Sequence, residues 1–340
     1  MIKIKDLLKY RSICMALAIV WVVYMHTDFD LAGGPLLTLR IIGYGGVDIF
    51  VFVSGIGCFC SFFKNPDVYE FLKKRFIKLA PLYWIVLIPW MIFKRITVGM
   101  TYSQMLGDVL FIQEFTMNDC SYSWYITAMW LYYFLVPFFY SILLKTKKKS
   151  GIAFVIIILT LMSLPFAPRG DLLIMVIRIV LFFIGMYVGK LAMEDKSLNK
   201  LHCIVLIFAC LLGGAILRYF VVNHNNLMSN YGMWWYPFIL ITPGLCLVIC
   251  LLSCWIDKIK VGSFLLKGVS YVGNHTYEIF LMHLFVYTFI RHFIFHGYIS
   301  GSYKTWFVAV LMVIVSSWLL ILVGKGINYQ MKKISDKRKK

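Results

Sequence analysis

Long apolar runs, separated by short polar and basic segments, dominate this chain of 340 residues. Several runs approach or exceed the roughly 20 residues that an α-helix needs to cross a bilayer. We predict ten such helices, over residues 11–28, 41–63, 79–97, 123–144, 151–167, 171–192, 202–222, 235–256, 274–295 and 305–325. A shorter run, 105–117, is interrupted by two acidic residues and is interpreted as interfacial. The predicted fold class is therefore all-α, a polytopic integral membrane protein.

Composition supports the membrane interpretation, and the distribution of basic residues explains the high positive charge. Hydrophobic residues make up 61% of the chain and charged residues only 14%, too apolar a balance for one soluble core. The formal net charge is +19, which in other contexts indicates nucleic-acid binding. Here the Lys and Arg residues gather in the short segments between apolar runs, so no nucleic-acid partner is expected.

The distribution of basic residues also predicts an orientation. When the N-terminus is placed in the cytoplasm, all but eight of the 34 Lys and Arg residues fall in cytoplasmic segments. The eight exceptions are Arg40, Lys94, Arg95, Arg169, Arg178, Arg218, Arg291 and Lys304. Both termini are therefore expected inside, in a multi-pass protein of the plasma (inner) membrane. We expect one transmembrane domain over 1–340, with a basic tail at 326–340 and no fused soluble domain.

Two histidines stand out because ionisable groups within a membrane are costly and are usually functional. His26 ends the apolar run that starts at Cys14, and His283 lies within the predicted helix 274–295. His26 is about 22 Å along its helix from Arg11, toward the outer face. His283 is expected near the midplane. The alternative for each is a hydrogen bond to a neighbouring helix.

Three further charged residues fall in the outer halves of predicted helices. These are Asp48, about 12 Å into its helix, and the two arginines Arg178 and Arg218. A shared polar cavity costs less free energy than isolated membrane charges, so we expect an outward-facing chamber that contains several of these groups. For Asp48, a structural ion pair with a basic residue is an alternative to direct catalysis.

A basic segment at the mouth of the third predicted helix is a candidate phosphate site. Arg75 and Lys78 are three residues apart and share a helical face. Together with Lys74 they could hold phosphate groups through charge-assisted hydrogen bonds. The alternative is a plain topology anchor.

Several short motifs, taken in order, resemble the membrane-bound acyltransferase-3 family over residues 10–290, most of the chain. They are His26 in the first helix, the run Gly45-Gly-Val-Asp48 with Ser54-Gly55, the basic segment followed by Pro81, the Trp124-Tyr-Ile-Thr motif, and Tyr277-Glu-Ile-Phe-Leu-Met-His283. Members of this family are multi-helix O-acyltransferases that acetylate surface polysaccharides and related glycans.

The resemblance implies transfer of an acyl group, usually acetyl, from cytoplasmic acetyl-CoA to a hydroxyl of a glycan or lipid-linked sugar in the membrane, without a metal. Arg11, Lys74, Arg75 and Lys78 would hold the CoA. His26 would act as general base or as acyl carrier, in a catalytic group with Asp48 and His283. An imidazole suits this role because its unperturbed pKa lies near working pH. Arg178, Arg218, Tyr277 and Glu278 would bind the acceptor.

The chain departs from the family pattern at three positions. Met15 replaces an arginine that usually lies eleven residues before the first-helix histidine, although Arg11 lies one turn earlier on nearly the same face. The second arginine of the family's basic motif is Lys78, which keeps the charge but loses a planar fork. Met129 replaces a glutamate that many relatives carry.

Two other classes of function fit part of the sequence. A secondary transporter or flippase for a lipid-linked sugar or an organic anion would also have buried charges and mid-helix prolines. No inverted repeat is visible, and the ordered motifs favour the acyltransferase. A non-catalytic sensor or scaffold is the third possibility. Binding or hydrolysis of acetyl-CoA by the purified protein would support the enzyme instead.

Overall fold

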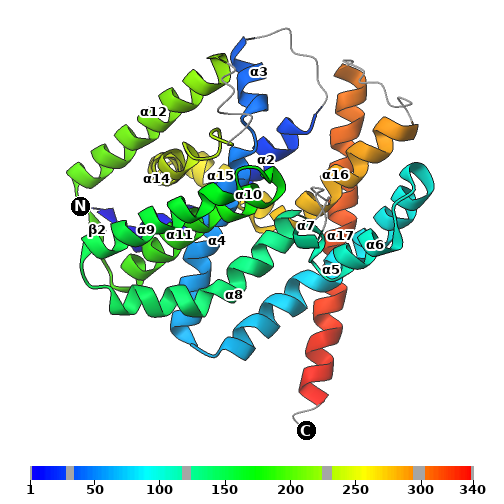
Figure 1. Ribbon diagram of the computed structural model, residues 1–340, viewed down its shortest axis with the longest axis horizontal. Coiled ribbons are helices and arrows are strands. Elements are labelled where there is room, and N and C mark those ends of the chain that lie inside the picture. The colour runs from blue at the N-terminus through cyan, green and yellow to red at the C-terminus, as the bar shows by residue number, and fades with distance from the viewer. Residues whose placement is uncertain (1, 28–33, 117–123, 224–231, 294–302, 338–340) are drawn as a thin grey trace. The chain divides into compact units, whose positions relative to one another are not determined.

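The computed structural model describes residues 2–27, 34–116, 124–223, 232–293 and 303–337 (Figure 1). In the first half of the chain the helices are α1 (Ile4–Leu7), η1 (Leu8–Tyr10), α2 (Arg11–Met25), α3 (Gly34–Ile41), α4 (Gly45–Lys64), α5 (Val68–Val98), α6 (Tyr102–Val109), α7 (Gln113–Thr116), α8 (Trp124–Lys145) and α9 (Lys149–Ser163). Then follow η2 (Leu164–Phe166), α10 (Gly170–Val176), α11 (Arg178–Met193), α12 (Lys200–Asn223), α14 (Phe238–Ile256), α15 (Lys260–Asn274), α16 (Thr276–Phe293) and α17 (Tyr303–Lys337). Two short strands, β1 (Ile2–Lys3) and β2 (Ser197–Leu198), pair antiparallel.

The all-α, polytopic membrane class predicted from the sequence is confirmed. Within the described ranges, nine helices are long and apolar enough to cross a bilayer. They cover residues 4–25, 45–64, 68–98, 124–145, 149–166, 172–193, 200–221, 238–256 and 306–331. The tenth predicted span, 274–295, is helical as α16 but is not among the nine. Glu278, His283 and Arg291 interrupt its apolar sequence. The run 105–117 forms the short helices α6 and α7.

The chain forms two compact units, each built from separated segments. The first unit comprises residues 1–18, 45–72 and 106–274, and the second comprises 19–44, 73–105 and 275–340. Helices α2, α5 and α6 therefore each contribute to both units. In the first unit α4 lies beside α11, and α12 lies beside α14 (Figure 1). In the second unit α16 lies beside α17 (Figure 1).

Glycines set how closely α4 and α11 approach in the first unit. A Cβ added at Gly55 of α4 would lie 2.3 Å from the carbonyl oxygen of Phe182, and one at Gly185 of α11 would lie 2.1 Å from that of Phe52. No side chain fits at these distances. Small residues allow this backbone contact between membrane helices, where dispersion and not the hydrophobic effect drives association.

We therefore expect Gly55→Ala to destabilise the protein by about 1–3 kcal/mol, the usual cost of forcing an extra methyl group into a packed contact. Gly57→Ala is the matched control on the same helix, because the nearest atom to its added Cβ is Nη1 of Arg11 at 3.8 Å. Thermal unfolding of the purified variants checks this. Equal unfolding midpoints for the two variants would contradict the role assigned to Gly55.

Polar contacts place several predicted cytoplasmic segments of the first unit on one face. Lys3 pairs with Asp195 at 3.0 Å, and Lys9 pairs with Asp257 at 2.7 Å. The hydrogen bond from Lys9 is the main reason that the pKa of Asp257 is lowered to about 2. The N-terminus, the α11–α12 connection and the end of α14 therefore lie together, as the predicted orientation requires. Which face is cytoplasmic stays a prediction.

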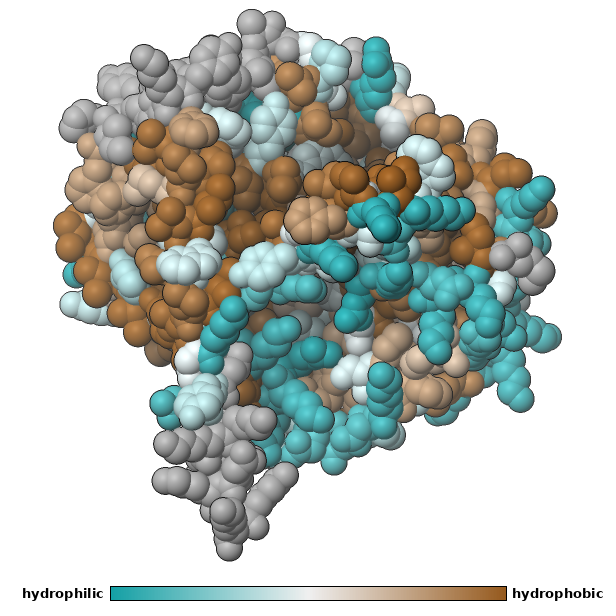
Figure 2. Space-filling view, turned by 180° about the vertical axis from the view of Figure 1, so that it is seen from behind, coloured by the Kyte–Doolittle hydropathy of each residue, from teal (hydrophilic) through white to brown (hydrophobic). Residues whose placement is uncertain are grey.

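Apolar side chains cover much of the molecular surface (Figure 2). Helix α12 is the clearest case, because Leu201, Phe208 and Leu211 are each more than 60% exposed. Exposed apolar area of this extent is unfavourable in water, and hydrocarbon is the solvent that suits it. We interpret these surfaces as facing lipid.

Candidate functional site

His26 and His283 lie side by side in the second compact unit. Their ring centroids are 5.1 Å apart, with the planes inclined at 65°. His26 follows the last residue of α2 and is half-buried, whereas His283 is in the second turn of α16 and is fully buried. The two histidines that the sequence singled out are thus in direct contact, although more than 250 residues separate them.

The hydrogen bonds of the two rings define their tautomers. Nδ1 of His26 is 2.9 Å from the carbonyl oxygen of Val22, and Nδ1 of His283 is 2.6 Å from that of Phe280. Because a carbonyl only accepts hydrogen bonds, each neutral ring carries its proton on Nδ1 and its lone pair on Nε2. Nε2 of His283 is buried and has no hydrogen-bond partner among the described residues. The pair thus contains at least one buried ring nitrogen whose lone pair accepts no hydrogen bond from the described residues.

Helix α3 holds the end of α2 in place beside this pair. Trp21 Nε1 donates to the carbonyl of Leu39 at 2.7 Å, and Tyr24 Oη donates to that of Leu36 at 3.1 Å. Nη1 of Arg40 in α3 donates to the carbonyl oxygen of Thr27 at 2.9 Å. Thr27 lies just after the end of α2, and a cation is favourable beside the carbonyls at the C-terminal end of a helix. These bonds fix the direction in which the chain leaves α2 at His26.

A hydrophobic cluster fixes the other histidine. Val286, Tyr287 and Ile290 of α16 pack against Ala309 and Val313 of α17, and Val23 of α2 packs on the same cluster. The rings of Phe280 and Tyr287 flank His283, with centroids 5.3 and 6.4 Å away. A packed apolar shell of this kind restricts side-chain rotation and holds the imidazole in one orientation.

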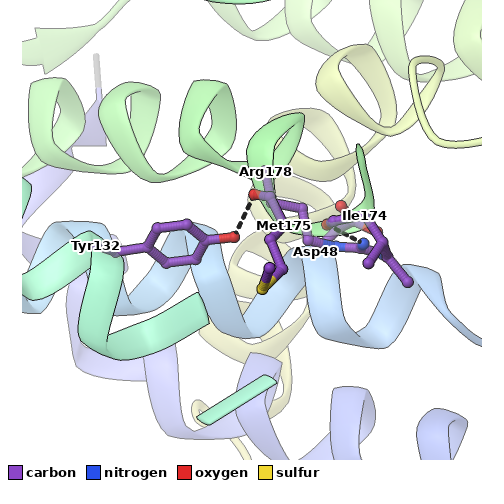
Figure 3. A network of polar contacts seen from close by, with 5 residues as sticks. All are labelled: Asp48, Tyr132, Ile174, Met175 and Arg178. Carbon is purple, nitrogen blue, oxygen red and sulfur yellow. Dashed lines mark hydrogen bonds and ion pairs between the residues drawn. The ribbon is translucent and has the colours of Figure 1, made fainter. Parts of the chain in front are cut away.

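Asp48 and Arg178 form a buried ion pair in the first unit (Figure 3). Oδ2 of Asp48 lies 3.0 Å from Nη2 of Arg178, and each side chain is only 1% exposed. Arg178 also donates to the carbonyl of Ile174 at 2.7 Å, and its guanidinium lies 5.4 Å from the ring of Trp124. Asp48 is in the first turn of α4, where the helix dipole favours a carboxylate.

Tyr132 extends this network from α8. Its hydroxyl donates to the carbonyl of Met175 at 2.7 Å, one residue beyond the carbonyl that accepts from Arg178 (Figure 3). Sequence reasoning named Asp48 and Arg178 but missed Tyr132, because one tyrosine in an aromatic-rich helix carries no distinguishing signal. Among the alternatives for Asp48, the structure places it in an ion pair.

The basic segment of α5 lies next to the start of α16 in the second unit. Lys74 and Lys78 are exposed and Arg75 is half-buried. The hydroxyl of Tyr277 donates to the carbonyl of Leu79 at 2.9 Å, and Leu79 directly follows Lys78. The predicted phosphate-binding segment therefore contacts the helix that carries His283.

The other predicted site residues have different surroundings. Glu278 lies 3.6 Å from Nδ1 of His275 at the start of α16. Arg218 is exposed on α12 and is not part of the network drawn in Figure 3. Arg11 is exposed and belongs to the first compact unit, whereas Lys74, Arg75 and Lys78 belong to the second. The proposed binding roles of these residues stay predictions.

Comparison with known proteins gives one informative match. A family model described as an acyltransferase domain covers residues 15–324, most of both compact units. The matched range includes the histidine pair, the Asp48–Arg178 pair and the basic segment of α5. No curated protein and no solved structure matches the chain.

Proposed function

The chain belongs to this acyltransferase-3 family and is a multi-pass membrane acyltransferase, and we propose that it transfers acetyl from cytoplasmic acetyl-CoA to a hydroxyl of a surface glycan or lipid-linked sugar. The proposed location is the plasma membrane. The family supports acyl transfer in general. The acetyl donor and the glycan acceptor are inferred from the motif resemblance and from the site.

One observation carries the proposal: a single helix connects the two parts of the site. Tyr277 of α16 contacts the end of the basic segment, and His283 follows six residues later on the same helix. At 1.5 Å per residue this separation is about 9 Å along the axis. An extended pantetheine arm readily spans such a distance. If Arg75 and Lys78 bind the phosphates of acetyl-CoA, its thioester can therefore reach the histidines.

The proposed chemistry needs one base that acts on the acceptor. Nε2 of His26 takes the proton of the acceptor hydroxyl as its oxygen attacks the thioester carbonyl. The new C–O bond forms, the C–S bond breaks, and the proton passes to the departing CoA thiolate. In the acyl-carrier variant, Nε2 of His26 attacks the thioester carbonyl, so that a C–N bond forms and the C–S bond breaks with release of the CoA thiolate. The acceptor hydroxyl then attacks the acyl-imidazole, the C–N bond breaks to restore Nε2, and the hydroxyl proton passes to the thiolate.

His283 is proposed to support His26 and not to touch the acceptor. It is fully buried, whereas His26 is half-buried and so more accessible to a substrate. A second neutral imidazole against the first favours the imidazolium that forms when His26 takes a proton. The backbone carbonyl of Phe280 keeps the proton of His283 on Nδ1.

The basic segment gives a direct prediction about the donor. Replacement of Arg75 and Lys78 by glutamine removes two charge-assisted phosphate contacts, each worth roughly 1.5–3 kcal/mol. We expect KM for acetyl-CoA to rise by on the order of 100-fold or more. Acetyl-pantetheine lacks the nucleotide phosphates, so its turnover by the double variant should match that by the wild type. An equal loss with both donors would contradict phosphate binding at this segment.

The function itself is tested with the purified protein and radiolabelled acetyl-CoA. Release of CoA, and transfer of label to an extracted membrane glycan, support the acyltransferase. Movement of a lipid-linked sugar across vesicles without acyl transfer would support the transporter instead. A purified protein that neither binds acetyl-CoA nor releases CoA from it would favour the sensor or scaffold.

A further inference from the structure

Helix α15 carries an exposed apolar stripe. Val261, Phe264, Leu265 and Tyr271 are 68%, 75%, 59% and 50% exposed. Phe264 and Leu265 follow Val261 by three and four residues, and Tyr271 follows Phe264 by seven, which places all four on one side of the helix. Trp255 at the end of α14, 64% exposed, and Ile259 before α15, 52% exposed, add to the apolar surface at this end of the first unit.

Contacts at both ends of α15 show that it does not run along the membrane-spanning direction. It begins just after Asp257, which is bound by Lys9 and Tyr10. Near its other end, Ser270 lies 2.6 Å from Ser12, and a Cβ at Gly273 would overlap the carbonyl of Ser12. Both ends are therefore tied to the same short stretch of chain at the start of α2. With 15 residues, about 22 Å, the helix is also too short to span the bilayer.

The charged side chains of residues 258–274 have one sign. Lys258, Lys260 and Lys267 are all exposed, and residues 258–274 contain no acidic residue. On the helix, Lys260 and Lys267 are seven residues apart and share one flank of the apolar stripe. Basic side chains beside an exposed row of aliphatic and aromatic residues are typical of a helix that lies in the headgroup layer of a membrane.

We propose that α15 is a membrane-surface helix that binds anionic phospholipid, with its apolar stripe among the acyl chains and Lys258, Lys260 and Lys267 at the headgroup phosphates. The single sign of charge selects an anionic lipid over a zwitterionic one. The inference does not depend on the acyl-transfer chemistry, because none of these residues belongs to the proposed site.

The test uses the full-length protein in lipid nanodiscs that contain a photoactivatable phosphatidylglycerol or a photoactivatable phosphatidylcholine. Mass spectrometry then locates the lipid adducts. We expect adducts between residues 255 and 271, more abundant with phosphatidylglycerol. The triple variant K258Q/K260Q/K267Q should lose this preference, since each lysine near the surface contributes about fivefold in affinity and three contribute on the order of 100-fold.

A matched control is available where the α8–α9 connection enters α9. Lys147, Lys148 and Lys149 are also exposed, so K147Q/K148Q/K149Q removes the same charge and should leave the α15 adducts unchanged. Equal labelling of α15 by the two lipids would overturn the proposal, as would cross-links from α15 to a second copy of the chain in place of lipid. Equal loss of the preference in both triple variants would also overturn it, because the effect would then be one of net charge.

Discussion

Replacement of His26 by alanine is expected to reduce acetyl transfer by on the order of 10²–10⁴-fold, the usual contribution of a positioned general base. The protein should still fold, since His26 is half-buried at the end of α2 and the hydrogen bond of its Nδ1 stays within its own helix. Release of CoA from labelled acetyl-CoA, together with the thermal unfolding midpoint, separates the loss of chemistry from a loss of structure.

The matched control for this variant is His292→Ala. His292 is an exposed histidine on α16, and its ring contacts Phe93 and Phe293 but not the histidine pair. Acetyl transfer by this variant should stay within a few-fold of wild type. If His26→Ala keeps comparable activity, His26 is neither the base nor the acyl carrier. Labelling of the wild type by radioactive acetyl-CoA without acceptor decides between those two roles, because only a carrier retains the label.

Nine of the ten spans predicted from hydropathy coincide with membrane-length helices in the described residues, and the reason is physical. A helix in hydrocarbon must be apolar along its whole length, so each span is marked by a continuous run of sequence. Where helices extend beyond the bilayer this signal is lost. The third span was predicted at 79–97, but α5 covers Val68–Val98, because the basic turns before Pro81 continue the same helix. Helix α3 also escaped prediction, since eight residues are too few for a span.

The cost of buried polar groups also selected candidate site residues, but it did not indicate which of them contact one another. His26, His283, Asp48 and Arg178 were each selected because a membrane rarely contains such side chains. Which of them meet depends on helix packing, and contacts such as that of Gly55 with the Phe182 carbonyl have no local sequence signature. The structure shows a histidine pair in one unit and an ion pair in the other. The common chamber that the sequence predicted stays a prediction.

The ion pair leads to the second large expected effect. Asp48→Leu would leave the Arg178 guanidinium buried without its carboxylate, and removing one partner of a buried pair destabilises proteins by about 3–5 kcal/mol. The unfolding midpoint of this variant should fall well below that of wild type. The double variant D48L/R178M replaces both charges with apolar side chains, and such replacements are often neutral or stabilising. We therefore expect the double variant to recover most of the lost stability.

The double variant also separates the two roles considered for Asp48. If the carboxylate only holds α4 to α11, a stably folded D48L/R178M protein should keep acetyl transfer within a few-fold of wild type. If Asp48 takes part in the reaction, the same stable protein should lose on the order of 10²–10⁴-fold in rate. The observed geometry favours the structural role, because Asp48 is 1% exposed and already bound by Arg178. A double variant that remains unstable would show that the pair is needed for packing that apolar side chains cannot replace.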